Sequence, residues 1–232
     1  MKVKWKIVML ASALLLAACQ QKDQQPATVV ATQQPVHQEN NAHNHNHNHS
    51  HSEETEIYEG YFDDSQVADR PLSDWQGEWQ SVYPHFESGA LDEVFEHKAQ
   101  ESLEKTFEQY KAYYGIGYQT DVDNITMGDN TISFHVEGKT ETAEYTYEKF
   151  EILTYEAGNR GVRFLFSKTG GSDDMPKFIQ FSDHGISPQK SDHYHLYWGE
   201  DQEELLEEMD RWPTYYPASL DGHDIAHEMM AH

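Results

Sequence analysis

The stretch "TISFHVEGKTETAEYTYEKFEILTYEAGNRGVRFLFSK", residues 131–168, determines the class of fold. Apolar and polar residues alternate along it in three runs, and a period of two is typical of strands with one buried face. The alternating apolar residues are Ile132, Phe134 and Val136, then Tyr145, Tyr147, Phe150 and Ile152, then Val162, Phe164 and Phe166. Gly138 and the pair Gly158-Asn159 separate the runs, as expected for turns between antiparallel strands.

Two more strands are expected downstream, in "PKFIQFSDHG" (residues 176–185) and "HYHLYWG" (residues 193–199). Short strands joined in sequence by turns favour an antiparallel meander, which either closes into a barrel or packs as a sandwich. Aromatic residues return near Tyr58 after a long polar segment. The sequence therefore predicts one mainly β domain over residues 57–232.

Helices are expected before and after these strands. Residues 72–89 carry large apolar side chains at a spacing that predicts a short helix ending at Pro84. Apolar residues recur every three or four positions over residues 91–114, which predicts one amphipathic helix that Gly115 follows. The segments "DQEELLEEMDRW" (residues 201–212) and "DGHDIAHEMMAH" (residues 221–232) predict two C-terminal helices.

The beginning of the chain has the features of a secretory signal peptide. Three lysines within the first six residues precede an apolar run at residues 7–18, which is too short to span a bilayer. The run ends in "LAAC", which resembles the lipobox of bacterial lipoproteins, so residues 1–18 are expected to be removed and Cys19 to be lipidated. An ordinary signal peptide cleaved after Ala18 is the alternative. Both place the protein outside the cytoplasm, and a single cysteine leaves it without an internal disulfide.

Residues 19–56 are expected to form a disordered tether, because residues 20–56 contain no aromatic residue, leucine or isoleucine. Histidines alternate with small polar residues in "HNHNHNHSH". These histidines are His43, His45, His47, His49 and His51. Several imidazoles on a mobile chain can wrap one Zn²⁺, Cu²⁺ or Ni²⁺ ion, so the tract is predicted to serve accessory metal capture. An expression tag is the alternative, against which the internal position of the tract argues.

The charge balance of the chain excludes one class of partner. It carries 41 acidic and 16 basic side chains, and its formal net charge is −25. Such a charge repels the phosphate backbone, so no nucleic-acid partner is expected. It also raises the local concentration of cations at the surface.

His184, His193 and His195 are the candidate metal ligands. His193 and His195 point to the same face of their expected strand, because neighbouring side chains alternate. If the preceding strand pairs with it through the loop "ISPQKSD", His184 lies opposite the pair, and three ring nitrogens can bind one Zn²⁺ with a fourth position open. Asp183 and Asp192 are then candidates to fix the ring tautomers. The alternative is that the three are ordinary surface or core histidines.

His223 and His227 also have ligand spacing, four residues apart on the last expected helix. The sequence shows no third partner for this pair. The two side chains are therefore expected to be exposed, without a metal.

Long motifs identify a family resemblance over residues 75–232. These motifs are "WQGEWQSVYP", "LDEVFEHKA", "KAYYGIGYQTDVDNI", "FEILTYEAGNRGVRFLF", "PKFIQFSDHGISP", "HYHLYWG" and "EMDRWPTYYP". In them the chain closely resembles the ZinT, or YodA-like, family of bacterial zinc-binding proteins. The resemblance implies a lipocalin-like barrel and a Zn²⁺ site at His184, His193 and His195. It also implies zinc acquisition under scarcity, with Zn²⁺ passed to the solute-binding component of a zinc ABC importer.

The resulting hypothesis is an extracytoplasmic zinc-binding lipoprotein without enzymatic activity, attached to a membrane through its lipid only. Family members of this type are often soluble in the periplasm and have a shorter histidine-rich stretch, so the anchor and the long tether are departures. Imidazole ligands without a thiolate favour labile binding and are compatible with Cd²⁺, Cu²⁺ or Ni²⁺ in vitro. Three alternatives stay open: a zinc hydrolase using the three histidines, Cd²⁺ sequestration, and a small organic ligand inside the barrel.

Overall fold

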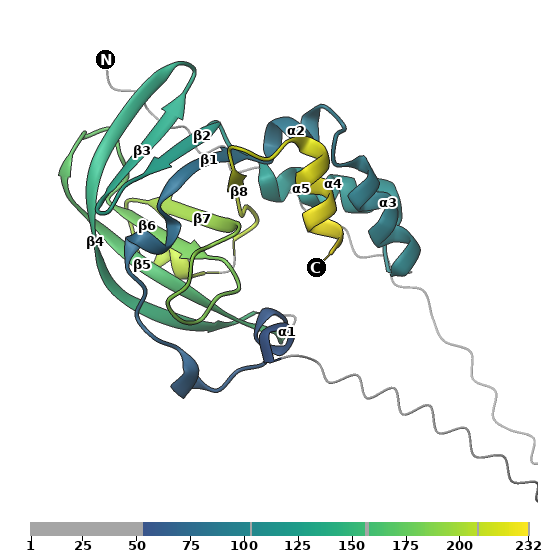
Figure 1. Ribbon diagram of the computed structural model, residues 1–232, viewed down its shortest axis with the longest axis horizontal. Helices are drawn as coiled ribbons and strands as arrows, with labels where there is room; N and C mark the ends of the chain where they lie inside the picture. The colour runs from purple at the N-terminus through teal and green to yellow at the C-terminus, as the bar shows by residue number, and fades with distance from the viewer. Residues whose placement is uncertain (1–52, 103, 156–157, 208, 232) are drawn as a thin grey trace, which may run out of the picture. The chain divides into compact units, whose positions relative to one another are not determined.

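The computed structural model describes residues 53–102, 104–155, 158–207 and 209–231, and its strands form one closed antiparallel barrel (Figure 1). Each strand pairs with the next along the chain, and β8 pairs with β1 to close the barrel. The strands are β1 (Gly77–Ser81), β2 (Asn124–Met127), β3 (Thr131–Val136), β4 (Lys139–Thr154), β5 (Arg160–Gly171), β6 (Phe178–Ser182), β7 (Tyr194–Gly199) and β8 (Thr214–Pro217). The mainly β, lipocalin-like barrel is therefore confirmed.

Most of the helices gather beside the barrel (Figure 1). The helical segments are α1 (Glu53–Tyr58), η1 (Asp64–Gln66), η2 (Leu72–Trp75), α2 (Tyr83–Glu87), α3 (Asp92–Glu101), α4 (Phe107–Tyr118), η3 (Glu204–Leu206) and α5 (Gly222–Met230). Helices α2, α3 and α4 lie between β1 and β2 in sequence, and α5 returns to pack on α3. Their apolar faces share a small core that includes Val94, Phe95 and Ile225. Among the residues described, no helix is long and apolar enough to cross a membrane.

The interior of the barrel is filled by aromatic side chains. Trp75 is fully buried and stacks on Phe181, with ring centroids 4.6 Å apart. Phe164 and Phe166 of β5 also contact the Trp75 ring. Alternation along β5 places Arg163 on the outer face of the wall, where its guanidinium lies 3.3 Å from the centre of the Tyr197 ring. The space in which a lipocalin-type organic ligand would sit is thus occupied by the protein's own core.

The prediction of a short helix in residues 72–89 that ends at Pro84 is wrong. The segment forms the 3-10 turn η2, then strand β1, and only then the short helix α2. Gly77 has a φ of +147°, a conformation that glycine adopts readily and that permits the change from turn to strand. Trp75 and Trp79 are four residues apart, which imitates a helical period, but Trp79 faces the barrel from β1. Pro84 begins α2, where its missing N–H costs nothing.

The long helix expected over residues 91–114 is two helices. Helix α3 ends at Glu101, and α4 begins after Thr106, whose hydroxyl accepts from the Gln109 N–H while the Gln109 side chain accepts from the Thr106 N–H. This capping box satisfies N–H groups that a continuous helix would not expose. Nor does Gly115 end the helix. A Cβ at that position would lie 2.7 Å from the Phe86 ring, so close packing explains the glycine.

The two C-terminal predictions have opposite outcomes. Helix α5 is confirmed at Gly222–Met230. In the segment at residues 201–212, the described part contains only the three-residue η3. Glu203 and Glu207 would stand four residues apart on one helix face, where like charges repel.

Substitution of Phe181 by alanine tests the aromatic interior. The Phe181 side chain is fully buried against Trp75, so its removal leaves a cavity, and we expect a loss of about 3–5 kcal/mol in the free energy of unfolding. Urea denaturation measures this change. Tyr61→Ala is the control, because Tyr61 is 70% exposed, and we expect a change within about 0.5 kcal/mol. Equal effects of both substitutions would show that the barrel interior does not carry the stability.

Candidate metal centre

The three candidate histidines lie at the adjoining ends of β6 and β7. Ser182, the last residue of β6, pairs with His195 of β7. His184 follows two residues after the end of β6, and His193 directly precedes β7. His184 has a φ of +62°, a left-handed conformation that is uncommon for a residue with a side chain. The turn after β6 thus directs the His184 side chain to the start of β7.

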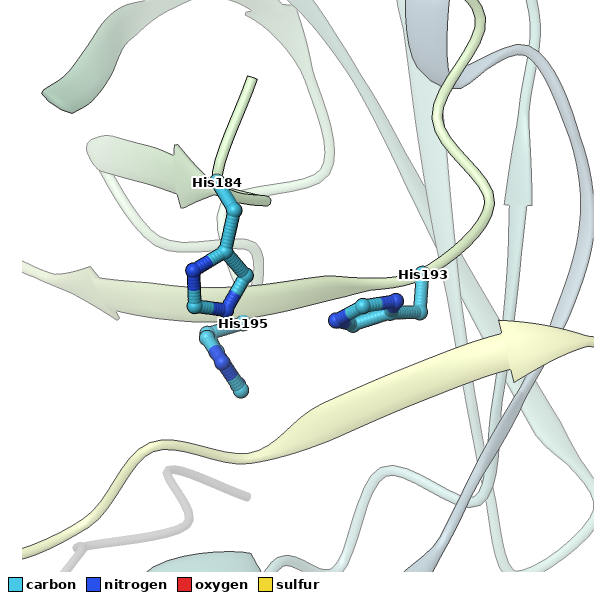
Figure 2. Close-up of side chains that lie close together, drawn as sticks. All are labelled: His184, His193 and His195. Atoms are coloured by element: carbon cyan, nitrogen blue, oxygen red, sulfur yellow. The ribbon is translucent and has the colours of Figure 1, made fainter. Parts of the chain in front are cut away.

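The three imidazole rings surround a common space (Figure 2). The ring centroids of His184 lie 5.7 Å from those of both His193 and His195, and the latter two are 6.0 Å apart. One nitrogen of each ring lies within 4.8 Å of the others. Zn–N distances of ~2.0–2.1 Å in a tetrahedral site correspond to ligand nitrogens about 3.4 Å apart, so small ring rotations suffice to bind one ion. In the described part of the chain, no other group of three such ligands comes this close.

The site lies on the outer face of the barrel. Tyr194 and Leu196 of β7 point into the aromatic interior, so His195, between them, points outward. His193 stacks on Tyr216, with ring centroids 5.0 Å apart, and Tyr216 belongs to the core of the helical cluster. The three histidines therefore lie between the barrel wall and the helices.

Hydrogen bonds determine the tautomers of two of the rings. The Thr214 hydroxyl donates to the Trp212 carbonyl, so its oxygen accepts from Nδ1 of His195 at 2.8 Å. Nδ1 of His184 donates to the Tyr58 carbonyl at 3.3 Å, and the Tyr58 ring stacks on His184. With the proton on Nδ1, the lone pair is on Nε2 in both rings. This pattern is the usual one for histidines that bind metals through Nε2.

The surroundings keep His195 uncharged. Burial lowers the pKa of His195 well below its usual value, and the neighbouring His184, His193 and Arg163 lower it further. A neutral imidazole has the lone pair that a metal requires, whereas a protonated ring has none. At neutral pH the ring therefore binds an ion without first losing a proton.

Neither Asp183 nor Asp192, which flank the histidines in sequence, bonds a histidine ring in the contacts described. Asp183 Oδ1 accepts from Nη1 of Arg70 at 2.6 Å and from the Gly185 N–H at 3.1 Å, and Asp192 is exposed. The expectation that they fix the tautomers of the rings is therefore wrong. Thr214 and the Tyr58 carbonyl do so for two of the rings.

Arg70 holds the loop that carries His184. It is fully buried, bonds Asp183, Asp74 and the Gln189 carbonyl, and lies 4.2 Å from the centre of the Trp75 ring. The loop is thereby tied at both of its ends to the segment before β1. Residue spacing gave no sign of Arg70, Tyr58 or Thr214, because each is far from the histidines in sequence. The predicted lipidation site Cys19 and the histidines of residues 43–51 lie outside the described residues.

Comparisons with known proteins identify the family of this chain. The family described as ZinT (YodA) periplasmic lipocalin-like zinc-recruitment matches residues 53–232. A "Probable metal-binding protein YrpE" of Bacillus subtilis (strain 168) is 60% identical over 181 residues, or 78% of this chain and 72% of the relative. The "Zinc-binding lipoprotein AdcA" of Streptococcus pneumoniae (strain ATCC BAA-255 / R6) is 51% identical over 177 residues, or 76% of this chain. This chain spans only 35% of that AdcA.

Solved structures show the same relationship. The crystal structure of the Zn(II)-bound ZinT-like domain of Streptococcus pneumoniae AdcA is 51% identical and has a TM-score of 0.72, covering 75% of this chain and 97% of that domain. Zn(II)-bound AdcA itself matches with a TM-score of 0.74 over 76% of this chain and 38% of AdcA. The similarity thus extends over nearly all of one domain of that larger protein.

Substitution of Arg70 by methionine tests the support of the His184 loop. It leaves the buried Asp183 carboxylate without its cation, and we expect a loss of about 3–5 kcal/mol in unfolding free energy, measured by urea denaturation. The double variant with Asp183→Asn should recover part of this loss. Lys111→Met is the control, because its pair with Asp92 is partly exposed and is expected to contribute at most about 1 kcal/mol. Similar losses for Arg70→Met and Lys111→Met would contradict the role of the buried pair.

Proposed function

The chain belongs to the ZinT family, and from this membership we propose that it captures Zn²⁺ outside the cytoplasm and passes it to the solute-binding component of a zinc ABC importer. The observation that carries the proposal is the convergence of His184, His193 and His195, whose ring nitrogens lie within 4.8 Å of one another. The names of its relatives support zinc as the ion, since AdcA is called zinc-binding and its ZinT-like domain has been solved with Zn(II).

The chemistry of the site suits reversible capture. Three imidazole ligands leave the fourth position of a tetrahedral Zn²⁺ ion open to water or to a ligand from a partner. Without a thiolate, binding is more labile than in a permanent structural site. The net charge of −25 attracts cations, although at 0.15 M ionic strength this effect is screened beyond ~8 Å. An ion can therefore be held and later released to a stronger site.

A hydrolytic function receives less support from the surroundings. A zinc hydrolase needs a general base near the metal-bound water. Of the two carboxylates that flank the histidines in sequence, that of Asp183 is engaged by Arg70, and Asp192 is exposed. We therefore propose binding without turnover.

The N-terminal segment completes the proposal. The lipid on Cys19 would hold the protein at a membrane, and the histidines at positions 43, 45, 47, 49 and 51 would collect ions through weak contacts. A flexible linker gives such a tract an effective concentration of order mM at a site on the same chain. Collection by the tract and tighter holding by the barrel would then be successive steps.

Zinc binding is tested by titration in competition with a chelator, on the segment 53–232 that matches the family. We expect one tight site, and a loss of affinity of more than about a hundredfold in His193→Ala, because even outer partners of a metal ligand are worth 10–100-fold. His135→Ala is the matched control. His135 lies on β3 and bonds the hydroxyls of Thr126 and Thr140, away from the site. Unchanged affinity in His193→Ala would refute the three-histidine site.

Transfer is tested separately by stopped-flow mixing of the zinc-loaded protein with the metal-free solute-binding component. Direct transfer predicts a rate that rises with the concentration of that component and exceeds the rate of Zn²⁺ loss to a chelator. A rate equal to the loss to the chelator, and independent of partner concentration, would show simple dissociation. In that case the protein would bind zinc without handing it over.

A further inference from the structure

The C-terminal helix α5 presents two imidazoles to solvent. Asp221 caps the helix by accepting from the N–H groups of His223 and Asp224, and Ile225 and Ala226 are fully buried. Buried contacts on one side fix which residues face outward. His223 and His227 are exposed, and their separation of four residues places their Cβ atoms ~5–6 Å apart on one face.

Helix α3 supplies the third group that the sequence did not reveal. Helices α3 and α5 pack side by side (Figure 1), and their apolar residues share one core. Oε1 of Glu93 on α3 lies 3.5 Å from Nδ1 of His223 on α5. Both side chains are accessible, with 47% of Glu93 and 79% of His223 exposed. A carboxylate and one imidazole therefore meet at the surface between two helices, and the second imidazole, that of His227, stands one turn further along the same face of α5.

We propose that Glu93, His223 and His227 form a second metal-binding site, separate from the three-histidine centre, for a divalent ion that accepts nitrogen and oxygen ligands, such as Zn²⁺ or Ni²⁺. Two imidazoles and one carboxylate are a known ligand set for Zn²⁺. The site forms when the exposed ring of His227 turns toward His223 by rotation of its side chain. Solvent completes the coordination of the ion.

We expect this site to bind its ion with lower affinity, and to exchange it faster, than the three-histidine centre. Its side chains are ordered only when the ion binds, so their rotamer entropy is lost on binding. Water reaches the ion from the exposed side. The site thus exchanges with free metal directly, and it needs no contribution from the barrel.

The test uses paramagnetic Ni²⁺ as the probe and the full chain labelled with ¹⁵N. Broadening of an amide signal reports an ion near that residue. Because the three-histidine centre lies against the core that α5 shares with Tyr216, the titration is run in a background with His184→Ala and His193→Ala, which removes that centre. We expect broadening at α5 and at the facing part of α3, with an apparent affinity for these signals that falls at least about tenfold in His223→Ala and in His227→Ala. Glu93→Gln should lower it by a smaller factor.

The controls exploit the exposure of these residues. Both histidines are exposed and alanine is the best helix former, so the variants stay folded. His135→Ala on β3 removes a histidine outside both sites and should leave the α5 titration unchanged. Absence of broadening at α5, or an affinity that does not change in His227→Ala, would overturn the proposal. Because the background lacks the three-histidine centre, either outcome is independent of whether that centre binds zinc.

Discussion

The barrel core and the three-histidine centre both depend on the alternation of side chains along β7 and β8. Tyr194 and Tyr215, which pair across the two strands, point into the barrel. Their neighbours His195 and Thr214, which also pair, point outward and bond each other. A shift of one residue in either strand would exchange these faces, burying the histidine in the aromatic interior and exposing the tyrosines. One register therefore secures both the barrel core and the metal centre.

Contacts from Tyr58 and Arg70 compensate for the unfavourable backbone conformation of His184. The left-handed backbone at His184 costs of order 1–3 kcal/mol unless the surroundings determine it. The Tyr58 ring and carbonyl fix the side chain, and the Arg70–Asp183 pair fixes the residue before it. A buried ion pair contributes little net stability compared with apolar packing, but it strongly opposes any conformation that separates its charges. Arg70 thus fixes the position of the loop, and the expected cost of its removal is that of leaving the Asp183 carboxylate buried without its cation.

The sequence predicted the parts of this structure that depend on local periodicity. The strands of residues 131–199 and the approach of His184 to His193 and His195 follow from alternation and from a short connection. The helix over residues 72–89 was wrong because Trp75 and Trp79 have a helical spacing in a segment where Gly77 permits a turn. Contacts between distant segments have no such signal. Arg70 to Asp183 spans 113 residues and His184 to Tyr58 spans 126, so neither could be read from spacing.

The histidines of the three-histidine centre and those of α5 differ in their exposure to solvent. At His195, enclosure by protein lowers the pKa, so protons compete less with a metal, and the neighbouring rings reinforce the effect because they disfavour a second positive charge. On α5 the rings are exposed, and water would compete with an ion at every position. An imidazole nitrogen is therefore suited to tight binding where protein surrounds it and to rapid exchange where solvent does. The difference lies in the surroundings of the ring. The barrel wall surrounds His195, whereas solvent surrounds His223.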